Sequence, residues 1–221
     1  MRYWLGMSVL VVLAAHLSYG ETPSKSLTVH HVLVAVLAKD AARASDIERG
    51  VTDDFVGRGI PAEGLHAVFA STVPVSEMQE QIRARDYDDV LCMTPRKTIR
   101  MPTDASKKIS SLKTCLAAYA TGKLPSGEPL EVNPFNIDGA RLIPPTGPDP
   151  LGNPIPTNPN AAHFRLNKRT LQLFDVRTGK LVWEKEVQVK VPADIQEGLE
   201  IPLLVHGIWE AIETSGILPK P

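Results

Sequence analysis

Hydrophobic positions in the first part of the chain are spaced first as in a strand and then as in a helix. Residues 27–37 form a nearly continuous apolar run rich in β-branched side chains, which predicts a buried strand. An apolar residue then recurs at every fourth position, at Ile47, Val51 and Phe55. This spacing predicts a helix with one apolar face, which begins with a capping box at Ser45 and Glu48 and ends near Gly59.

The same order of elements follows once more. Residues 65–70 predict a second strand, and Ser76 and Gln79 predict a capping box for a second helix. The apolar face of that helix consists of Val75, Met78 and Ile82. The short run 90–93, which stops before Pro95, predicts a third strand. Three strands alternating with two helices predict a β-α-β-α-β unit with right-handed crossovers and a largely parallel sheet.

Proline is concentrated in one segment of the second half. A third helix is predicted at 106–120, and ten of the 19 prolines of the chain follow within 125–159. Proline removes a backbone donor and fixes φ, so neither a helix nor a central strand is expected in this segment. A long segment without regular structure is usually functional or disordered.

Regular patterns return after the proline-rich segment. Residues 170–175 and 181–191 predict a hairpin, in which the second strand alternates apolar and polar residues and only Lys185 interrupts the apolar side. Residues 201–215 predict an amphipathic helix. The fold class expected is therefore α/β, with a single mixed sheet, a βαβαβ half, a hairpin and a C-terminal amphipathic helix. We expect residues 21–221 to form one domain, with 125–159 as a proline-rich insertion.

The amino terminus has the zones of a secretory signal peptide. Arg2 is followed by an apolar run at 4–15 and by small residues before a cleavage site expected between Gly20 and Glu21. The run has about 12 residues, whereas a membrane-spanning helix needs about 20. We therefore expect residues 1–20 to be removed, no retained transmembrane helix, and an exported protein that is periplasmic or, alternatively, extracellular.

Export changes the interpretation of the two cysteines, Cys92 and Cys115. In an oxidising compartment such a pair predicts a disulfide, which would stabilise the fold by about 3 kcal/mol through closure of the intervening loop. The alternative is two separate buried thiols. No cysteine precedes Cys92, so the lipid-modified cysteine of a bacterial lipoprotein is not expected.

Composition excludes several classes of protein. The formal net charge is -1 and 43% of the residues are hydrophobic, which disfavours a globally basic nucleic-acid binder, a disordered chain and a disulfide-dense mini-protein. Basic residues gather locally at Arg96, Lys97, Arg100, Lys107, Lys108 and Lys113. They indicate either contact with an anionic surface or a solvated face.

Candidate chemistry is sparse. The mature chain has five histidines, none at metal-ligand spacing, and no hydrolase, zinc-protease or nucleotide-binding motif, so no catalytic residue, metal or cofactor is predicted. Asp88 and Asp89 are adjacent before a strand, where carboxylates are usually solvated turn residues.

One string of residues is recognisable. Asp175, Thr178, Gly179 and Trp183 form a D-x-x-T-G-x-x-x-W hairpin, which looks like the hairpin of quinoprotein-type propeller blades. A propeller needs about four or more copies, and this chain has one. Together with the exported βαβα order and the last helix, the hairpin is similar to small bacterial envelope proteins of the architecture of the penicillin-binding-protein activator LpoB, the periplasmic part of the curli secretion lipoprotein, and the N-terminal domain of TolB. The resemblance implies a mainly non-enzymatic accessory with no catalytic residue to carry over.

Three hypotheses of function follow. The first is an exported, non-catalytic envelope accessory that binds another envelope protein or the cell wall. The second is a periplasmic hydrolase or small-molecule enzyme with the proline-rich segment as a lid, in which strand ends would line the cleft with Lys39, Asp40, Ser71, Thr72 and Thr94. The third is a secreted interaction factor that presents its proline-rich arm as polyproline II.

Overall fold

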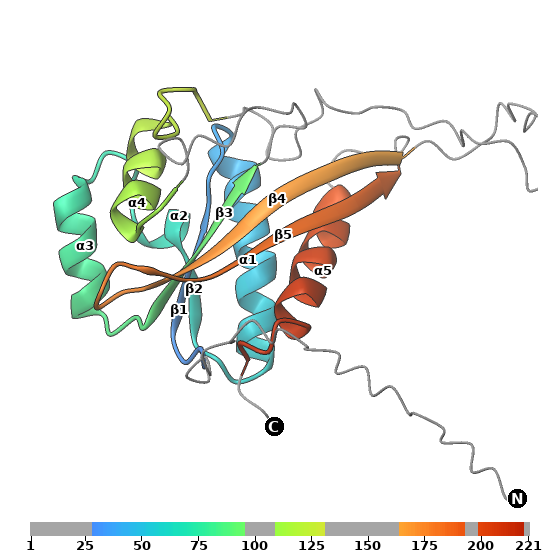
Figure 1. The fold of residues 1–221 in the computed structure, drawn as a ribbon, viewed down its shortest axis with the longest axis horizontal. Coiled ribbons are helices and arrows are strands. Elements are labelled where there is room, and N and C mark those ends of the chain that lie inside the picture. Colours follow the sequence, from blue (N-terminus) through green and yellow to red (C-terminus); the bar gives the residue numbers. More distant parts are fainter. Residues whose placement is uncertain (1–27, 96–108, 131–163, 193–198, 219–221) are drawn as a thin grey trace, which may run out of the picture.

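The computed structural model describes residues 28–95, 109–130, 164–192 and 199–218. Its strands form one mixed sheet in the order β2-β1-β3-β4-β5 (Figure 1). In chain order the strands are β1 (Val32–Val36), β2 (Ala62–Gly64), β3 (Asp89–Pro95), β4 (Phe164–Asp175) and β5 (Leu181–Pro192). The expected fold class, α/β with a single mixed sheet, a hairpin and a C-terminal helix, is confirmed.

Helices cover both faces of the sheet. The helices are α1 (Ala41–Gly57), α2 (Leu65–Val68), α3 (Val75–Ala84), α4 (Leu112–Thr121) and α5 (Glu200–Glu213). Helices α1 and α5 pack on one face, and α2, α3 and α4 lie on the other (Figure 1). Strands β1, β2 and β3 are parallel, whereas β4 is antiparallel to both β3 and β5.

Side chains of β1 alternate between two hydrophobic cores. Val32, Val34 and Val36 belong to the core under α1 and α5, while Leu33 and Ala35 belong to the core under α3 and α4. All five residues are fully buried. Because a strand buried on both faces needs apolar residues at every position, the sequence shows a continuous run and not an alternation.

Two helices begin at residues other than those expected. The Asp40 carboxylate accepts a hydrogen bond from the Arg43 N–H (3.2 Å), so α1 starts directly after Asp40. Asp is a strong N-cap residue, and Ser45 consequently lies inside the helix. In the same way Pro74 occupies the N-cap of α3, and Ser76 lies in its first turn. Both predicted capping boxes are therefore wrong. The apolar faces of the two helices nevertheless consist of the residues predicted from the spacing.

The strand predicted at 65–70 is also wrong. Strand β2 comprises only Ala62–Gly64, and the chain then forms the short helix α2. The register pairs β2 with three residues of β1 only. The physical cause is a buried carboxylate, that of Glu48, which occupies the position beside β1 where a longer β2 would lie.

The later elements are present where they were predicted, but with different starts: α4 begins at Leu112, after the non-helical residues 109–111, and not at residue 106, and β4 begins at Phe164 and not at residue 170. Helix α4 begins after a capping box between Ser111 and Thr114. Strands β4 and β5 have 12 residues each, and their register shifts between Leu173 and Phe174. None of the helices in the described residues combines the length and the hydrophobicity needed to cross a bilayer.

Candidate functional site

Glu48 places a carboxylate inside the protein beside the carboxyl end of β1. Its side chain is 1% exposed. Oε1 accepts a hydrogen bond from the Val36 N–H (2.8 Å), and Oε2 accepts one from the His66 N–H (2.9 Å). The carboxylate thus serves as acceptor for the edge of β1 and for the first turn of α2. This double role explains why strand pairing stops at Gly64.

His66 is oriented by the same carboxylate. Its Nδ1 lies 2.7 Å from Glu48 Oε1, and its ring packs edge-on against that of Tyr119, with the centroids 4.9 Å apart. The Tyr119 hydroxyl donates a hydrogen bond to the Phe69 carbonyl at 2.5 Å. Burial, and then the charge of Glu48, raise the pKa of Tyr119 to about 12, so its hydroxyl stays protonated at neutral pH.

Sequence reasoning missed this pair. A signal for Glu48 exists, because it lies four residues after Ala44 and three before Val51, both of which are buried on the apolar face of α1. A charged residue on such a face must find partners inside the protein. His66 has no equivalent signal, since its partner lies on another helix and is brought to it by tertiary packing.

The five residues expected to line an enzyme cleft differ in their structural roles and in their burial. Asp40 caps α1, and Thr94 is buried in β3. The other three are exposed: Lys39, Ser71 and Thr72. Among the described residues, the hydrogen bonds of His66 go to Glu48 and to none of these five. The contacts of Glu48 and His66 therefore support the turn from β2 into α2.

Three neighbouring carboxyl groups lie at the opposite end of the sheet. Asp89, at the start of β3, stands across from Asp175 at the end of β4 and follows Asp88. Asp89 is only 5% exposed and so differs from the solvated turn residue that was expected. Burial first, and then the charges of Asp175 and Asp88, raise the pKa of Asp89 to about 7. Within the described part of the chain, no cluster of three or more ligand-type side chains could hold a metal ion.

The recognisable hairpin residues shape the turn between β4 and β5. Asp175 Oδ1 accepts hydrogen bonds from the N–H (2.6 Å) and the hydroxyl (2.7 Å) of Thr178. Burial acts to raise the pKa of Asp175, but these hydrogen bonds and the charge of Arg177 lower it overall. Gly179 has a φ of 68°, which favours glycine, and Trp183 packs partly buried against the core under α1 and α5.

A disulfide joins α4 to the sheet. Cys92 on β3 and Cys115 on α4 are bonded, with their Cα atoms 6.6 Å apart, and both residues are fully buried. This bond fits the pairing expected from the sequence.

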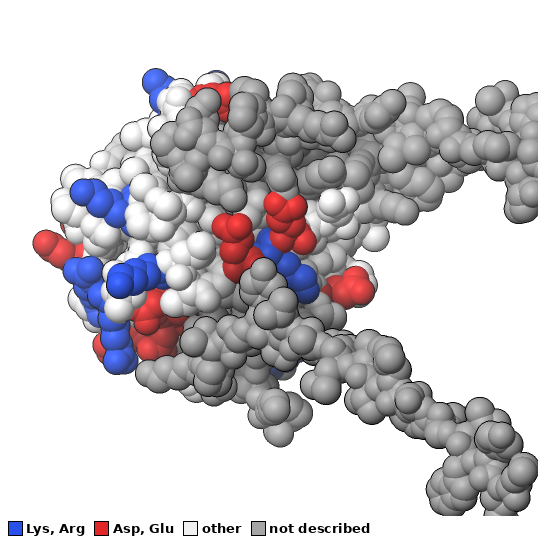
Figure 2. Space-filling view, viewed as in Figure 1, with Lys and Arg blue, Asp and Glu red and all other residues white. Residues whose placement is uncertain are grey.

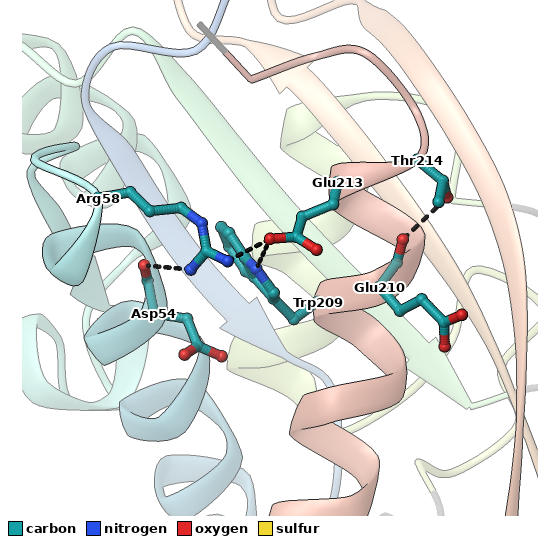
Figure 3. Close-up of polar contacts among 6 residues, drawn as sticks. All are labelled: Asp54, Arg58, Trp209, Glu210, Glu213 and Thr214. Atoms are coloured by element: carbon teal, nitrogen blue, oxygen red, sulfur yellow. Dashed lines mark hydrogen bonds and ion pairs between the residues drawn. The ribbon is translucent and has the colours of Figure 1, made fainter. Parts of the chain in front are cut away.

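Helices α1 and α5 are fastened together at their carboxyl ends (Figure 3). The Arg58 guanidinium lies 4.1 Å from the centroid of the Trp209 ring and forms an ion pair with Glu213. The Glu213 carboxylate also accepts a hydrogen bond from Trp209 Nε1 at 2.8 Å. The hydrogen bonds from Trp209 and then Arg58 lower the pKa of Glu213. Phe55 completes the cluster, edge-on to Trp209 at 5.0 Å.

Replacing Arg58 with alanine should lower the free energy of unfolding by about 1 kcal/mol, because a largely exposed cation–π contact contributes about that much. Arg58→Lys is the matched control: it keeps the charge but loses the planar stacking on Trp209, so its loss should be smaller. Urea unfolding followed by Trp fluorescence measures both. Equal stability of all three proteins would show that the contact contributes nothing.

Strand β5 forms one edge of the sheet. In the described part of the chain it pairs with β4 alone, which leaves one side of a 12-residue strand open. Val187 and Val189 face the core under α1 and α5. The alternate residues are exposed: Val182, Glu184, Glu186 and Gln188. Figure 2 shows acidic side chains near the middle of the face turned to the viewer, with a basic side chain directly beside them.

The cation that interrupts the apolar side of β5 is held by α5. Lys185 Nζ donates hydrogen bonds to the Ala211 carbonyl (3.0 Å) and to Thr214 Oγ1 (2.8 Å). A lysine at this place also complements the negative carboxyl end of the helix. Lys185 therefore belongs to the contact between β5 and α5.

Helix α5 runs along the open edge. Gly207 approaches β5 so closely that a Cβ atom there would lie 2.5 Å from Val189 Cγ2. Leu203 lies one turn before Gly207 and is 38% exposed, and Leu199, the N-cap residue of α5, is 55% exposed. We refer to the open edge of β5 with these two leucines as the β5 edge surface. Open edges and exposed apolar side chains are common features of interaction sites.

Several expected features lie outside the described residues. They are the signal peptide with its cleavage site at Gly20 and Glu21, most of the proline-rich segment, and the basic residues Arg96, Lys97, Arg100, Lys107 and Lys108. Lys113, the remaining member of the basic group, is exposed on α4.

Comparison with known proteins identifies no family. No family model and no curated protein match the chain. Similar solved structures include the PelC dodecamer from Paraburkholderia phytofirmans, with 11% identity over 90% of this chain and 94% of that chain and a TM-score of 0.43. The lipoprotein GNA1162 from Neisseria meningitidis has 10% identity over 84% and 99%, with a TM-score of 0.39. Protein XCC0632 from Xanthomonas campestris has 9% identity over 88% and 86%, with a TM-score of 0.36. At these TM-scores the similarities carry no argument about function.

Proposed function

We propose that this chain is an exported, non-catalytic accessory protein of a bacterial envelope, which binds another envelope protein through the β5 edge surface. The observation that carries the proposal is the 12-residue edge of β5, which the described residues leave open, together with exposed Leu199 and Leu203 at the start of α5, the helix that packs against β5. An open edge offers a row of backbone donors and acceptors to an added strand, and the leucines offer apolar area beside it.

Two features support export. The amino-terminal sequence has the three zones of a signal peptide, and the bond between Cys92 and Cys115 suits an oxidising compartment. A role in binding is favoured over hydrolysis because the Glu48–His66 pair is engaged in supporting the fold, as its three hydrogen bonds show.

Site-specific photo-crosslinking in cells of the native host tests the proposal. A crosslinking amino acid at Leu203 or Gln188 should give a defined adduct with one envelope protein. The same group at Glu77, an exposed residue of α3 on the other face, is the control and should not give that adduct. Adding Leu199→Glu should weaken the adduct from Gln188. Equal adducts from all positions, or adducts with cell-wall polymer alone, would contradict binding of an envelope protein at this surface.

A further inference from the structure

Helix α4 belongs to a short stretch of the described chain, residues 109–130, which we call the α4 unit. Residues 96–108 separate this unit from β3, and residues 131–163 separate it from β4. The unit lies on the face of the sheet away from α1 and α5 (Figure 1). Ordering such a stretch against the sheet costs conformational entropy, which its own tertiary contacts must offset.

Polar contacts hold the α4 unit at its start and at Tyr119. Gln172 Nε2 donates a hydrogen bond to the Ile109 carbonyl (2.8 Å). The Leu112 N–H donates one to the Gly179 carbonyl in the turn between β4 and β5 (3.0 Å). The Tyr119 hydroxyl adds the hydrogen bond to the segment after α2 that is described above. Between these points the unit is held by apolar side chains buried against the sheet and by the disulfide.

The disulfide between Cys92 and Cys115 joins α4 directly to β3, the central strand of the sheet. The chain has no other cysteines, so this is its one covalent cross-link, and it spans a sequence separation of 23. While the bond is intact, an α4 unit that leaves the sheet stays tethered to Cys92 and gains little freedom. Without the bond the detached unit has many more conformations, which favours detachment.

We propose that the disulfide is a redox-sensitive switch for the α4 unit: oxidation keeps the unit on the sheet, and reduction lets it detach while the core under α1 and α5 stays folded. In the reduction a dithiol passes two electrons and two protons to the disulfide, which breaks into two thiols, and the dithiol itself becomes a disulfide.

The other core keeps its structure because none of its described members comes from the α4 unit. For an exported chain, the switch means that the fold is completed only after transfer to an oxidising compartment. The switch does not rest on the partner proposed above, because no residue of the α4 unit belongs to the β5 edge surface.

Hydrogen exchange followed by mass spectrometry tests the switch on the full mature chain, either oxidised or refolded in dithiothreitol. Reduction should speed the exchange of α4 amides about 100-fold, the factor expected from opening a loop of this length. In the reduced protein, α4 amides should exchange about tenfold faster than α1 amides or more, because α1 is protected by the core that stays folded. The double variant Cys92→Ala, Cys115→Ala should match the reduced protein and should not respond to dithiothreitol.

Trypsin gives an independent measurement. Lys113 on α4 and Arg49 on α1 are both exposed helical residues, so exposure alone does not distinguish them. Cleavage within a helix requires local opening. Both sites should resist trypsin in the oxidised protein, whereas reduction should lead to cleavage after Lys113 well before cleavage after Arg49.

Three results would overturn the proposal. Equal exchange of α4 amides in the oxidised and reduced proteins would show that noncovalent contacts alone keep the unit in place. Equal exchange of α4 and α1 amides in the reduced protein would show that the domain unfolds as a whole, and the same holds if the reduced protein and the double variant do not fold at all. A response of the double variant to dithiothreitol would show that the reductant acts elsewhere than on this bond.

Discussion

Replacing Glu48 with alanine is expected to lower the free energy of unfolding by about 4 kcal/mol. The substitution removes the acceptor for the Val36 and His66 N–H groups, and it also removes the partner of the His66 ring. Each buried donor left without an acceptor costs about 1–3 kcal/mol, and bonds to a charged acceptor are the stronger ones. Urea unfolding monitored by circular dichroism measures the loss.

Two variants make this expectation specific. Asp53→Ala, at an exposed position of the same helix, should change stability by less than about 0.5 kcal/mol. Glu48→Gln has nearly the same shape and keeps one acceptor oxygen. Its free energy of unfolding should therefore lie between those of the wild type and of Glu48→Ala. If Glu48→Ala unfolds at the same urea concentration as Asp53→Ala, the carboxylate does not support the turn from β2 into α2.

The spacing of apolar residues predicted most elements of this fold, because it is set by burial on one or two sides. The continuous run of β1 corresponds to a strand buried at every position, and the alternation on β5 to a strand buried on one side at Val187 and Val189. The stripe Ile47, Val51 and Phe55 likewise faces the core. Burial involves a whole face of an element. The spacing therefore identifies the buried face even where the predicted start of the element is wrong.

Element boundaries depended on single contacts that spacing does not encode. Residues 65–70 have the composition of a strand, yet the Glu48 carboxylate bonds the His66 N–H and the chain forms a helix there. Asp40 begins α1 ahead of Ser45 because it stands nearer to the strand end and caps as strongly. In both cases a hydrogen bond from one side chain fixed where the element begins or ends. The position of that side chain in the fold cannot be read from the spacing of apolar residues.

The order of strands in the sheet could likewise not be predicted from the sequence. The hairpin was predictable, but whether β4 or β5 would lie beside β3 decides which of the two is the edge. That choice places Glu184 and Glu186 at an open edge and Leu203 beside it. The proposed interaction surface thus follows from topology, and the recognisable hairpin motif contributes only Trp183 to its strand.

The free energy of unfolding should fall as pH rises from about 4 to about 7, and Asp89→Asn should remove much of this dependence. The pKa of Asp89 is about 7 in the folded protein and 3.8 in its ordinary state, so the folded protein retains a proton that the unfolded chain releases between these values. The stabilisation is complete below pH 4 and is lost as pH passes through 7. The full shift corresponds to about 4 kcal/mol, and solvent at the end of the sheet should reduce this to about 2 kcal/mol.

Asparagine has the shape of aspartic acid without its charge, so Asp89→Asn should gain stability over the wild type by about 2 kcal/mol more at pH 8 than at pH 4. Urea unfolding at four pH values between these limits measures the difference, in which the other titrating groups largely cancel. Asp88→Asn is the matched control: it removes a smaller contributor to the raised pKa of Asp89, and it should move the loss of stability to lower pH without abolishing it. Parallel pH profiles of wild type and Asp89→Asn would mean that Asp89 is ionised in the folded protein, and that burial at the start of β3 does not hold its proton.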